Sequence, residues 1–575
     1  MDKLTICLSG QICREGSANL KSFWQGFINI QRQIPNDYDL QIVGHCWNPE
    51  FNDLVKNVYD LDFLLSEKQP NFVKEFMPAI QPIDKFEKGL KRANSLWHKC
   101  SPQALLGISK SRSKAIKLLD KLKLDDNARV LAARWDQGCT GSKEVHQMII
   151  DPSLPSDYIY ISYYSEIDEG YADMWFFTNK QLASKFSKYS DFVMECLSGE
   201  NDYFEDYTIN GWHYALPKKG HSRYVIFIKS KLVNSIEKAL FYLIQYSPCG
   251  IIKNKFIGLH HKLNVLINKP VLSGENSIDF NKDIERTVTF PNYLALNNHS
   301  ILKYFIKEKN IREKTRFLDI KDFDNKSGKT INPLDFAYVI YTHSSFSDCW
   351  EMAVNQAKEN LPLNCTKIYL LSEESEATKV AKENIRDTSI ELITYNDNDV
   401  YSVRLSNCLF NIRKNYEFAY FVHEDMPLVS KVDDIYLNSL LHYLSNSNEF
   451  FIKLVDTSYV DKKEAHEQFP ELVKNIGGYA FSIQPSLIKL DDYLPFISAF
   501  KHGIYDLENV STHSNFIFSA VSGYRKVGKY LIANDRFPHI ATAIAKGKWC
   551  TSEWRDEIAY LAGKYKISLS DRGEC

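Results

Sequence analysis

Two stretches of the chain alternate short apolar runs with segments of helical periodicity, and this alternation limits the possible folds more than any other feature of the sequence. In the first stretch, the runs that predict strands are 4–8, 40–44 and 129–133. In the second stretch, the expected strands are 336–341, 367–371, 390–395 and 418–422. Strands that alternate with helices form mainly parallel sheets, because parallel neighbours need a long crossover connection. The sequence therefore predicts two α/β domains of one Rossmann-related fold class.

The 575 residues are enough for two such domains and a connecting segment. We predict domains at 1–225 and 335–575, joined by a largely helical, Lys-rich middle segment at 226–334. This segment is expected to bridge the domains, and contact with anionic lipid is the alternative. No apolar run has the length of a secretory signal or a membrane span, and the twelve cysteines form no CxxC pairs. We therefore expect a cytoplasmic protein, with peripheral contact at the inner face of a membrane as the alternative.

Composition and motifs exclude several classes of function. With 44% apolar and 25% charged residues, the chain has the composition of an ordinary globular protein. Its 70 Lys and Arg residues against 72 Asp and Glu give a net charge of −2, which lacks the basic excess of a nucleic-acid-binding protein. The motifs GxGxxG, GxxxxGKS/T, HExxH and GxSxG are absent. The sequence therefore lacks the motifs that would indicate a dinucleotide oxidoreductase, a P-loop phosphotransferase, a zinc protease or an α/β-hydrolase.

Polar side chains gather where the predicted strands end. In α/β sheets, ligands bind beyond the carboxyl ends of the strands, where helix N-termini point donors at anions. In the first half these strand-end residues are Ser9, Gly10, Gln11, Arg14, His45, Arg134 and Asp136, and in the second half they are Thr342, His343, Ser344, Ser345, Glu373, Glu374, His423, Glu424 and Asp425. A carboxylate directly after an apolar strand can hold a divalent cation, which neutralises a diphosphate. The alternative at each single site is a residue that caps the next helix or turn.

The His-Glu-Asp segment at 423–425 gives the sharpest of these signals, because it follows a strand long enough to cross a core. Alternate residues of an extended chain face the same side. His423 and Asp425 are therefore expected to share a face and to clamp a metal ion or phosphate, whereas Glu424 on the other face is expected to be structural. Arg404, on the preceding helix, could contact a phosphate through two hydrogen bonds, and a surface ion pair is its alternative.

Two further groups could take part in catalysis. The segment 166–175 combines carboxylates with aromatic residues, which suits sugars, and Asp168, Glu169 or Asp173 could act as general base on an acceptor hydroxyl. The alternative is an acidic surface loop with its aromatic side chains in the core. Near the C-terminus, His539 and Lys548 could offset the charge of a departing diphosphate, or belong to a solvated basic helix end.

The first half resembles the WavE-like bacterial capsule and lipopolysaccharide glycosyltransferases. The resemblance rests on an Arg-x-Asp at 134–136 that stands where a DxD motif would be, and on an Asp–aromatic–apolar segment at 172–177. The strand ends at 8–14 and 44–47 are also similar to segments that contact the nucleotide in that family. The resemblance covers roughly residues 1–215 and implies a GT-A-like fold.

The second half is similar to another group of GT-A-like polysaccharide glycosyltransferases, found in bacteria and large viruses. There a strand-terminal His-Glu-Asp takes the DxD position, as at 423–425, and the C-terminal segments 547–549 and 571–573 look like that group too. This resemblance spans about 335–575 and implies a second GT-A-like domain.

We therefore hypothesise a bifunctional glycosyltransferase that moves sugars from nucleotide-diphosphate donors to a growing surface polysaccharide, free or lipid-linked. Mg²⁺ or Mn²⁺ would be held by Asp136 in the first domain and by His423 and Asp425 in the second. The expected nucleotide contacts are Ser9, Gly10, Gln11, Arg14, Arg134, His343, Ser344 and Arg404. The alternatives are one catalytic domain beside an inactive glycan-binding or scaffolding domain, and a nucleotidyltransferase. The sequence leaves the donor sugar, the linkage and the oligomeric state open.

Overall fold

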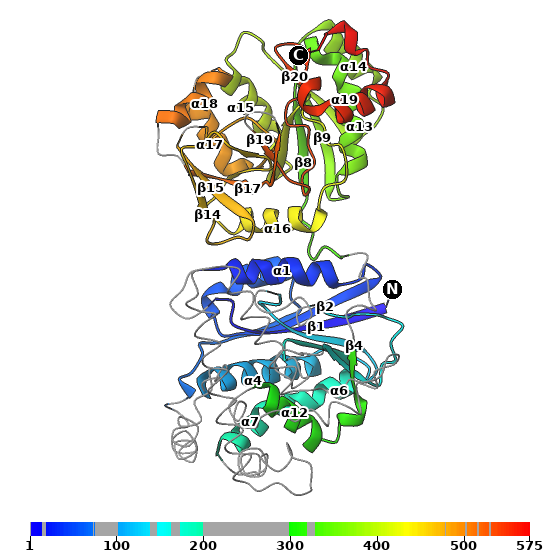
Figure 1. Ribbon diagram of the computed structural model, residues 1–575, viewed down its shortest axis with the longest axis vertical. Coiled ribbons are helices and arrows are strands. Elements are labelled where there is room, and N and C mark those ends of the chain that lie inside the picture. Colours follow the sequence, from blue (N-terminus) through cyan, green and yellow to red (C-terminus); the bar gives the residue numbers. More distant parts are fainter. Residues whose placement is uncertain are drawn as a thin grey trace, which may run out of the picture. The chain divides into compact units, whose positions relative to one another are not determined.

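The computed structural model describes residues 2–13, 19–72, 74, 102–138, 147–162, 173–198, 298–318, 328–477, 479–500, 503–513, 517–527 and 531–574. The chain divides into two compact units, which Figure 1 draws in the colours of the sequence. Unit 1 comprises Met1–Gly16 and Arg32–Lys329, and unit 2 comprises Ser17–Gln31 and Thr330–Cys575. The predicted domain boundaries at 225 and 334 stay a prediction, because most of the middle segment lies outside the described residues.

Unit 1 is built on a sheet that has seven strands among the described residues, in the order β3-β2-β1-β4-β6-β5-β7. The strands are β1 (Asp2–Gly10), β2 (Tyr38–Cys46), β3 (Phe63–Ser66), β4 (Arg129–Arg134), β5 (Ile159–Ser162), β6 (Trp175–Asn179) and β7 (Thr315–Leu318). Of these strands, β6 alone runs antiparallel to its neighbours. The interior residues of β1 and β4 are buried, as expected for central strands covered on both faces.

Helices cover one face of this sheet, where Figure 1 shows α4, α6, α7 and α12 side by side. Within the described part of unit 1, the α-helices that follow α1 (Lys21–Gln33) are α2 (Asn52–Tyr59), α4 (Pro102–Lys117), α6 (Lys180–Lys185), α7 (Tyr189–Ser198) and α12 (Asn298–Glu308). Leu105 and Ile116 of α4 pack in one core with Phe186 and Phe305. Asn179 ends β6 and caps α6, because its side chain accepts a hydrogen bond from the N–H of Leu182 at 2.9 Å.

Unit 2 is built on a sheet that has nine strands among the described residues, in the order β10-β9-β8-β11-β16-β12-β17-β15-β14. The strands are β8 (Phe336–Tyr341), β9 (Cys365–Glu373), β10 (Ile390–Tyr395), β11 (Phe418–His423), β12 (Phe451–Lys453), β14 (Lys462–Ala465), β15 (Leu472–Ile476), β16 (Ser486–Lys489) and β17 (Ile517–Val521). Smaller sheets join β13 (Asp456–Thr457), β18 (Arg525–Val527) and β19 (Leu531–Ala533), and pair β20 (Ile544–Ala545) with β21 (Lys548–Trp549).

The helices of unit 2 lie on both sides of its sheet, with α13, α14 and α19 on one side in Figure 1 and α15, α17 and α18 on the other. They are α13 (Trp350–Asn360), α14 (Glu376–Asn384), α15 (Tyr401–Ile412), α16 (Asp434–Ser445), α17 (Leu490–Ala499), α18 (Ile504–His513) and α19 (Thr551–Tyr565). Leu405 and Leu494 contribute to a core with strand residues such as Val339, while Met352 and Trp554 contribute to a second core beneath α19.

Both units share one plan, which confirms the predicted α/β class with parallel-rich sheets. Seven neighbouring strands of each large sheet, β3 to β7 in unit 1 and β10 to β17 in unit 2, have the order 3-2-1-4-6-5-7 when they are numbered among themselves along the chain, and the sixth is antiparallel. The order reverses between β1 and β4 in unit 1 and between β8 and β11 in unit 2. Loops from adjacent strands diverge at such a reversal, which makes it the expected ligand site of an open α/β sheet.

The first part of helix α1 (Lys21–Gln33) belongs to unit 2, although the sequence places it between two strands of unit 1. The ring of Trp24 packs edge-on against Tyr443 at 5.8 Å, and the ring of Phe27 packs against His442 at 5.6 Å. Gln31 Nε2 donates to Ser439 Oγ at 3.0 Å. The apolar face of α1 therefore pairs with α16, which the periodicity of the helix alone could not indicate.

Candidate functional site

The carboxyl ends of β8 and β11 in unit 2 bring together two acidic residues. Glu424 and Asp425 follow β11 directly, in a tight turn that is closed by a hydrogen bond from the Met426 N–H to the His423 carbonyl at 3.0 Å. Glu424 is buried, with 5% of its surface exposed, and it forms a hydrogen bond with the side chain of Thr342 at the end of β8. Its second oxygen, Oε2, has no hydrogen-bond partner. A buried carboxylate with an unpartnered oxygen is costly, and such a residue indicates a site built for a ligand.

Burial and mutual repulsion shape the electrostatics of this pair. Burial, together with the neighbouring charge of Asp425, raises the pKa of Glu424 to about 8. Burial likewise raises the pKa of Asp425 to about 7, against the hydrogen bond that it accepts from the Ile544 N–H. Arg572 favours the charged form of Glu424 but forms its own ion pair with Asp348, at 2.8 Å from Nε to Oδ2. A cation between the two carboxylates would relieve their repulsion.

The described contacts of His423 lead away from this pair and do not support the predicted His423–Asp425 clamp, which stays a prediction. His423 Nε2 is 3.2 Å from the hydroxyl of Tyr401 in α15, and its ring packs near Tyr341 at 5.4 Å. Asp425 interacts with Glu424 instead. The physical reason is that β11 ends at His423 and the chain turns there, so the two-residue alternation of a strand no longer applies to the residues that follow. Among the described residues, no three His, Cys, Asp or Glu side chains converge as a ready metal site.

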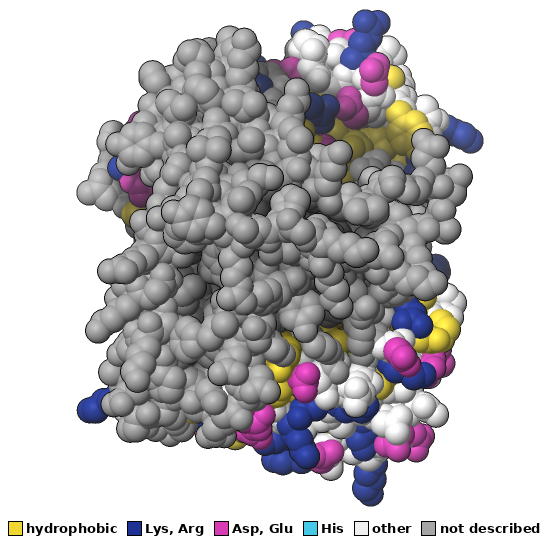
Figure 2. Space-filling view, turned by 60° about the horizontal axis from the view of Figure 1, so that its bottom comes forward, with side chains coloured by type: hydrophobic (Ala, Val, Ile, Leu, Met, Phe, Trp, Pro, Cys, Tyr) yellow, Lys and Arg dark blue, Asp and Glu magenta, His cyan; other side chains and the backbone are white. Residues whose placement is uncertain are grey.

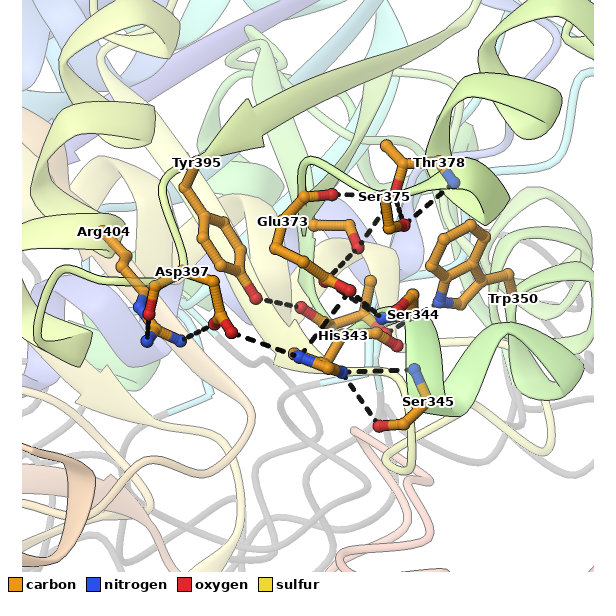
Figure 3. Close-up of polar contacts among 12 residues, drawn as sticks. His343, Ser344, Ser345, Trp350, Glu373, Ser375, Thr378, Tyr395, Asp397 and Arg404 are labelled. Carbon is orange, nitrogen blue, oxygen red and sulfur yellow. Dashed lines mark hydrogen bonds and ion pairs between the residues drawn. The ribbon is translucent and has the colours of Figure 1, made fainter.

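A second polar cluster, shown in Figure 3, lies at the ends of β8, β9 and β10. The carboxylate of Glu373 accepts the N–H of Ser344 through both oxygens, at 3.0 Å each. His343 Nε2 lies 3.6 Å from Glu373 and 3.9 Å from Asp397, and 40% of its side chain is exposed. Although burial opposes it, the hydrogen bonds from Ser344 and Ser372 hold the pKa of Glu373 below its usual value. The cluster thus presents a fixed carboxylate and a reachable imidazole.

Arg404 belongs to the same cluster, and the alternative prediction for it, an ion pair, is present. Its Nη1 lies 2.7 Å from Asp397, its Nε donates to the carbonyl of Asp399 at 2.6 Å, and its guanidinium lies over the ring of Tyr395 at 5.4 Å. Tyr395 in turn stacks on Tyr341 at 5.2 Å with nearly parallel rings. Arg404 therefore fixes the loop after β10 beside the strand ends (Figure 3).

The structure gives His539 and Lys548 other surroundings than those predicted. His539 is buried, and both ring nitrogens have partners at 2.6 Å: Nδ1 donates to the Met426 carbonyl, and Nε2 accepts from the Tyr420 hydroxyl. Burial lowers its pKa to about 4. Its burial and its two hydrogen bonds place it in the core and do not support the predicted role in leaving-group stabilisation. Lys548 is exposed in the β20–β21 hairpin rather than at a helix end, and its turn uses Gly547 at φ +77°.

Changing Tyr420 to Phe tests the structural assignment of His539. The variant removes the hydroxyl that donates to His539 Nε2 and leaves that buried acceptor unpaired. We expect the free energy of unfolding to fall by about 1–3 kcal/mol. Urea denaturation followed by circular dichroism measures this change. Unchanged stability would contradict the buried hydrogen bond.

Three of the predicted strand-end residues of unit 1 form hydrogen bonds with neighbouring residues of the unit. The hydroxyl of Ser9 donates to the Ala133 carbonyl at 3.5 Å, and the N–H of Gly10 donates to Ser111 Oγ at 2.7 Å. Gln11 Nε2 donates to Gln69 at 2.5 Å. These contacts hold the carboxyl end of β1 to its neighbours.

Two of the acidic residues predicted for unit 1 also have hydrogen-bond partners within the unit. Arg134 donates to both oxygens of Asp136, from Nε at 2.9 Å and from Nη2 at 2.8 Å, which does not support the predicted metal role of Asp136. Asp173 is buried, and its carbonyl accepts from the buried Arg112. Arg14, Asp168 and Glu169 lie outside the described residues.

The sequence marked His45 as a strand-end residue, but it did not indicate the buried polar chain of unit 1 to which His45 belongs. His45 Nδ1 lies 2.8 Å from Ser111 Oγ, and Nε2 lies 3.3 Å from Glu67, which pairs with Lys114. Burial lowers the pKa of His45 to about 4. Ser111 and Lys114 stand in α4, far from the strand ends in sequence, and no local motif marks them. In unit 2, Glu373 and Glu424 were visible as charges at strand ends, but their importance depends on burial.

Surface charge and hydropathy add two observations. In the described part of the face in Figure 2, Lys and Arg side chains lie among Asp and Glu side chains. Within the described residues, no helix combines the length and the apolar character needed to cross a bilayer.

Comparisons with known proteins give partial matches. No protein-family model and no curated protein matches the chain. A cytidylyltransferase from Leptospira borgpetersenii matches with a TM-score of 0.24 and 11% identity, over 41% of this chain and 96% of that one. S. aureus TarS 1–349 matches with a TM-score of 0.24 and 11% identity, over 42% and 68% of the two chains. The galactosyltransferase LgtC matches with a TM-score of 0.20 and 12% identity, over 33% and 73%. TM-scores this low do not indicate a function for this chain.

Proposed function

We propose that the protein is a glycosyltransferase that takes its sugar from a nucleotide-diphosphate donor bound at the carboxyl ends of β8 and β11 in unit 2. One observation carries the proposal: Glu424, buried and with an unpartnered oxygen, lies next to Asp425 where the strand order reverses. Carboxylates without a compensating cation at a strand-order reversal suit a ligand that arrives with a metal ion.

The residues present fit a divalent cation. Two adjacent carboxylates offer the oxygen ligands that Mg²⁺ prefers, and burial raises the pKa of both. Glu424 and Asp425 would hold the ion, which when bound would neutralise the diphosphate and act as a Lewis acid toward it. Thr342 orients Glu424 through its hydrogen bond, and the Ile544 N–H orients Asp425. The carbonyl of His423 closes the turn by accepting the Met426 N–H.

The cluster at the ends of β8, β9 and β10 would bind the nucleoside end of such a donor. His343 is partly exposed between two carboxylates, Glu373 and Asp397. Carboxylates accept hydrogen bonds from ribose hydroxyls, as in other α/β nucleotide sites. Arg404 holds Asp397 in place through their ion pair. We assign the acceptor to the hydroxyl of a surface glycan, free or lipid-linked, in keeping with the predicted substrate class.

The test is turnover of a nucleotide-sugar panel with Mg²⁺ or Mn²⁺, read out as released nucleoside diphosphate. Asp425→Asn and Glu424→Gln remove one charge each, and we expect kcat to fall about 100-fold or more, since about 2.7 kcal/mol of transition-state stabilisation corresponds to that factor. Glu376→Gln, which changes an exposed carboxylate at the start of α14, is the matched control and should leave turnover unchanged. Release of pyrophosphate instead of nucleoside diphosphate would identify a nucleotidyltransferase. Wild-type turnover in both site variants would overturn the proposed site.

A further inference from the structure

The two units can be compared residue by residue, because strand register aligns their central strands. In unit 1, Ser9 of β1 pairs with Arg134, the last residue of β4. In unit 2, Tyr341 of β8 pairs with His423, the last residue of β11. Each pair stands on the two strands that flank the reversal of strand order. The residues after β4 and after β11 therefore occupy corresponding positions in the two sheets.

At the position of Glu424, unit 1 has Trp135. This tryptophan is fully buried, and its Nε1 donates to the His45 carbonyl at 2.9 Å. Its ring packs edge-on against Tyr59 at 5.3 Å and fills the space over Gly44, where a Cβ atom would lie 2.6 Å from it. The side chain is part of the core. An apolar ring thus fills the place where unit 2 has a carboxylate with an unpartnered oxygen.

The next position repeats the contrast. Asp136 corresponds to Asp425, but both of its oxygens accept from Arg134, which itself stands at the position of His423. The pair is partly exposed, with 25% of the Arg134 and 28% of the Asp136 side chain accessible. The negative charge of Asp136 is therefore already balanced within its own strand end. In unit 2, Asp425 instead lies beside a second carboxylate.

The neighbouring strand shows the same exchange. Ser9 pairs with His45 of β2, and Tyr341 pairs with Leu371 of β9, so Trp47 corresponds to Glu373 two residues further along. Trp47 is 4% exposed, and its Nε1 donates to the Gly107 carbonyl at 2.9 Å. Two acidic residues of unit 2, Glu373 and Glu424, thus correspond to tryptophans in unit 1.

We infer that, within the described residues, the cation-dependent site for a nucleoside diphosphate lies in unit 2, and that unit 1 is a like-folded unit whose described strand ends are closed by Trp47 and Trp135. This inference rests on the proposed function and assigns its donor site to one unit. Two acidic residues at the described edge of unit 1 have cationic partners: Glu67 pairs with Lys114, and Asp136 pairs with Arg134. On this inference, unit 1 does not carry out the cation-dependent transfer expected for the first domain.

Calorimetric titration of UDP, GDP and CDP into the full chain with saturating Mn²⁺ tests the inference. We expect one site per chain for whichever nucleotide binds. Asp425→Asn should weaken binding about 100-fold or more, because even changes outside the first ligand shell cost about 10–100-fold in metal affinity. Asp136→Asn, the matched change in unit 1, should leave both stoichiometry and affinity as in the wild type. Electron paramagnetic resonance of free Mn²⁺ gives an independent count of bound ions in each variant.

The outcomes separate this inference from the proposed function. Two nucleotide sites per chain, or the loss of a site in Asp136→Asn, would overturn the inference and leave the proposed function standing. The absence of any Mn²⁺-dependent nucleotide binding by the wild type would overturn the proposed function, and this assignment with it. Thermal unfolding of each variant, read by circular dichroism, shows that the chain is folded when binding is measured.

Discussion

Trp135→Ala should lower the free energy of unfolding by about 3–5 kcal/mol, the range found when a buried aromatic side chain is removed from a core. Trp135 is 0% exposed, so the whole indole ring leaves a cavity. The backbone limits any collapse into this cavity, because Gly44 beneath the ring has no side chain to fill it. The variant also leaves the His45 carbonyl without the indole N–H that it accepts. Urea denaturation followed by circular dichroism measures the loss.

Leu363→Ala is the control for this experiment, because Leu363 is fully exposed and its removal opens no cavity. Its stability should stay within about 0.5 kcal/mol of the wild type. Because the two units can unfold in separate transitions, the experiment must identify which unfolding transition shifts in Trp135→Ala. A loss below 1 kcal/mol would show that Trp135 does not fill the core at the strand ends of unit 1.

Lys453→Met should change how stability depends on pH. Lys453, the last residue of β12, is 0% exposed, and its Nζ lies 3.3 Å from the Tyr479 carbonyl and from Ser482 Oγ. Burial lowers its pKa to about 7 from 10.5. Between these values the unfolded chain binds a proton that the native chain has released, so stability rises with pH through this window. The slope is at most about 1.4 kcal/mol per pH unit, and methionine abolishes it.

Denaturation of wild type and Lys453→Met at pH 6, 7.5 and 9 measures this difference. The variant should be the more stable protein at pH 6, where the wild type must bury a charged lysine, and its advantage should shrink as the pH rises. Lys379→Met, at a lysine that is 72% exposed, should run parallel to the wild type. Parallel profiles for wild type and Lys453→Met would contradict a buried lysine that loses its proton near neutrality.

Much of the fold was predictable, because central parallel strands are buried on both faces and read as unbroken apolar runs. The expected strands 336–341 and 390–395 coincide with β8 and β10. The prediction failed where a strand is short or half exposed, as in β3, or where aromatic residues follow an acidic loop, as in β6. Apolar residues at helical spacing in 111–124 predict a helix there; the observed α4 begins earlier, at Pro102, and proline suits a first helical turn.

The candidate site was predictable in place but not in detail. The end of a buried strand can be recognised in a sequence because charged residues follow an apolar run. This pattern predicted the site at 423–425. The orientation of its side chains was not predictable, because the turn that follows β11 breaks the alternation of the strand. His423 consequently faces Tyr401, and Glu424 becomes the buried acid.

The sequence by itself determined the fold class, the tandem plan and the edges of the sheets where ligands can bind, because local periodicity and hydrophobic burial act over a few residues at a time. Only the tertiary structure decided which charged side chains lie without a partner of opposite charge. Whether a carboxylate is neutralised depends on partners such as Arg134 for Asp136, and on burial that distant segments provide. Those contacts depend on which strands and helices are neighbours in the fold. As a result, one sheet has a carboxylate pair where the other has buried tryptophans and a neutralised aspartate.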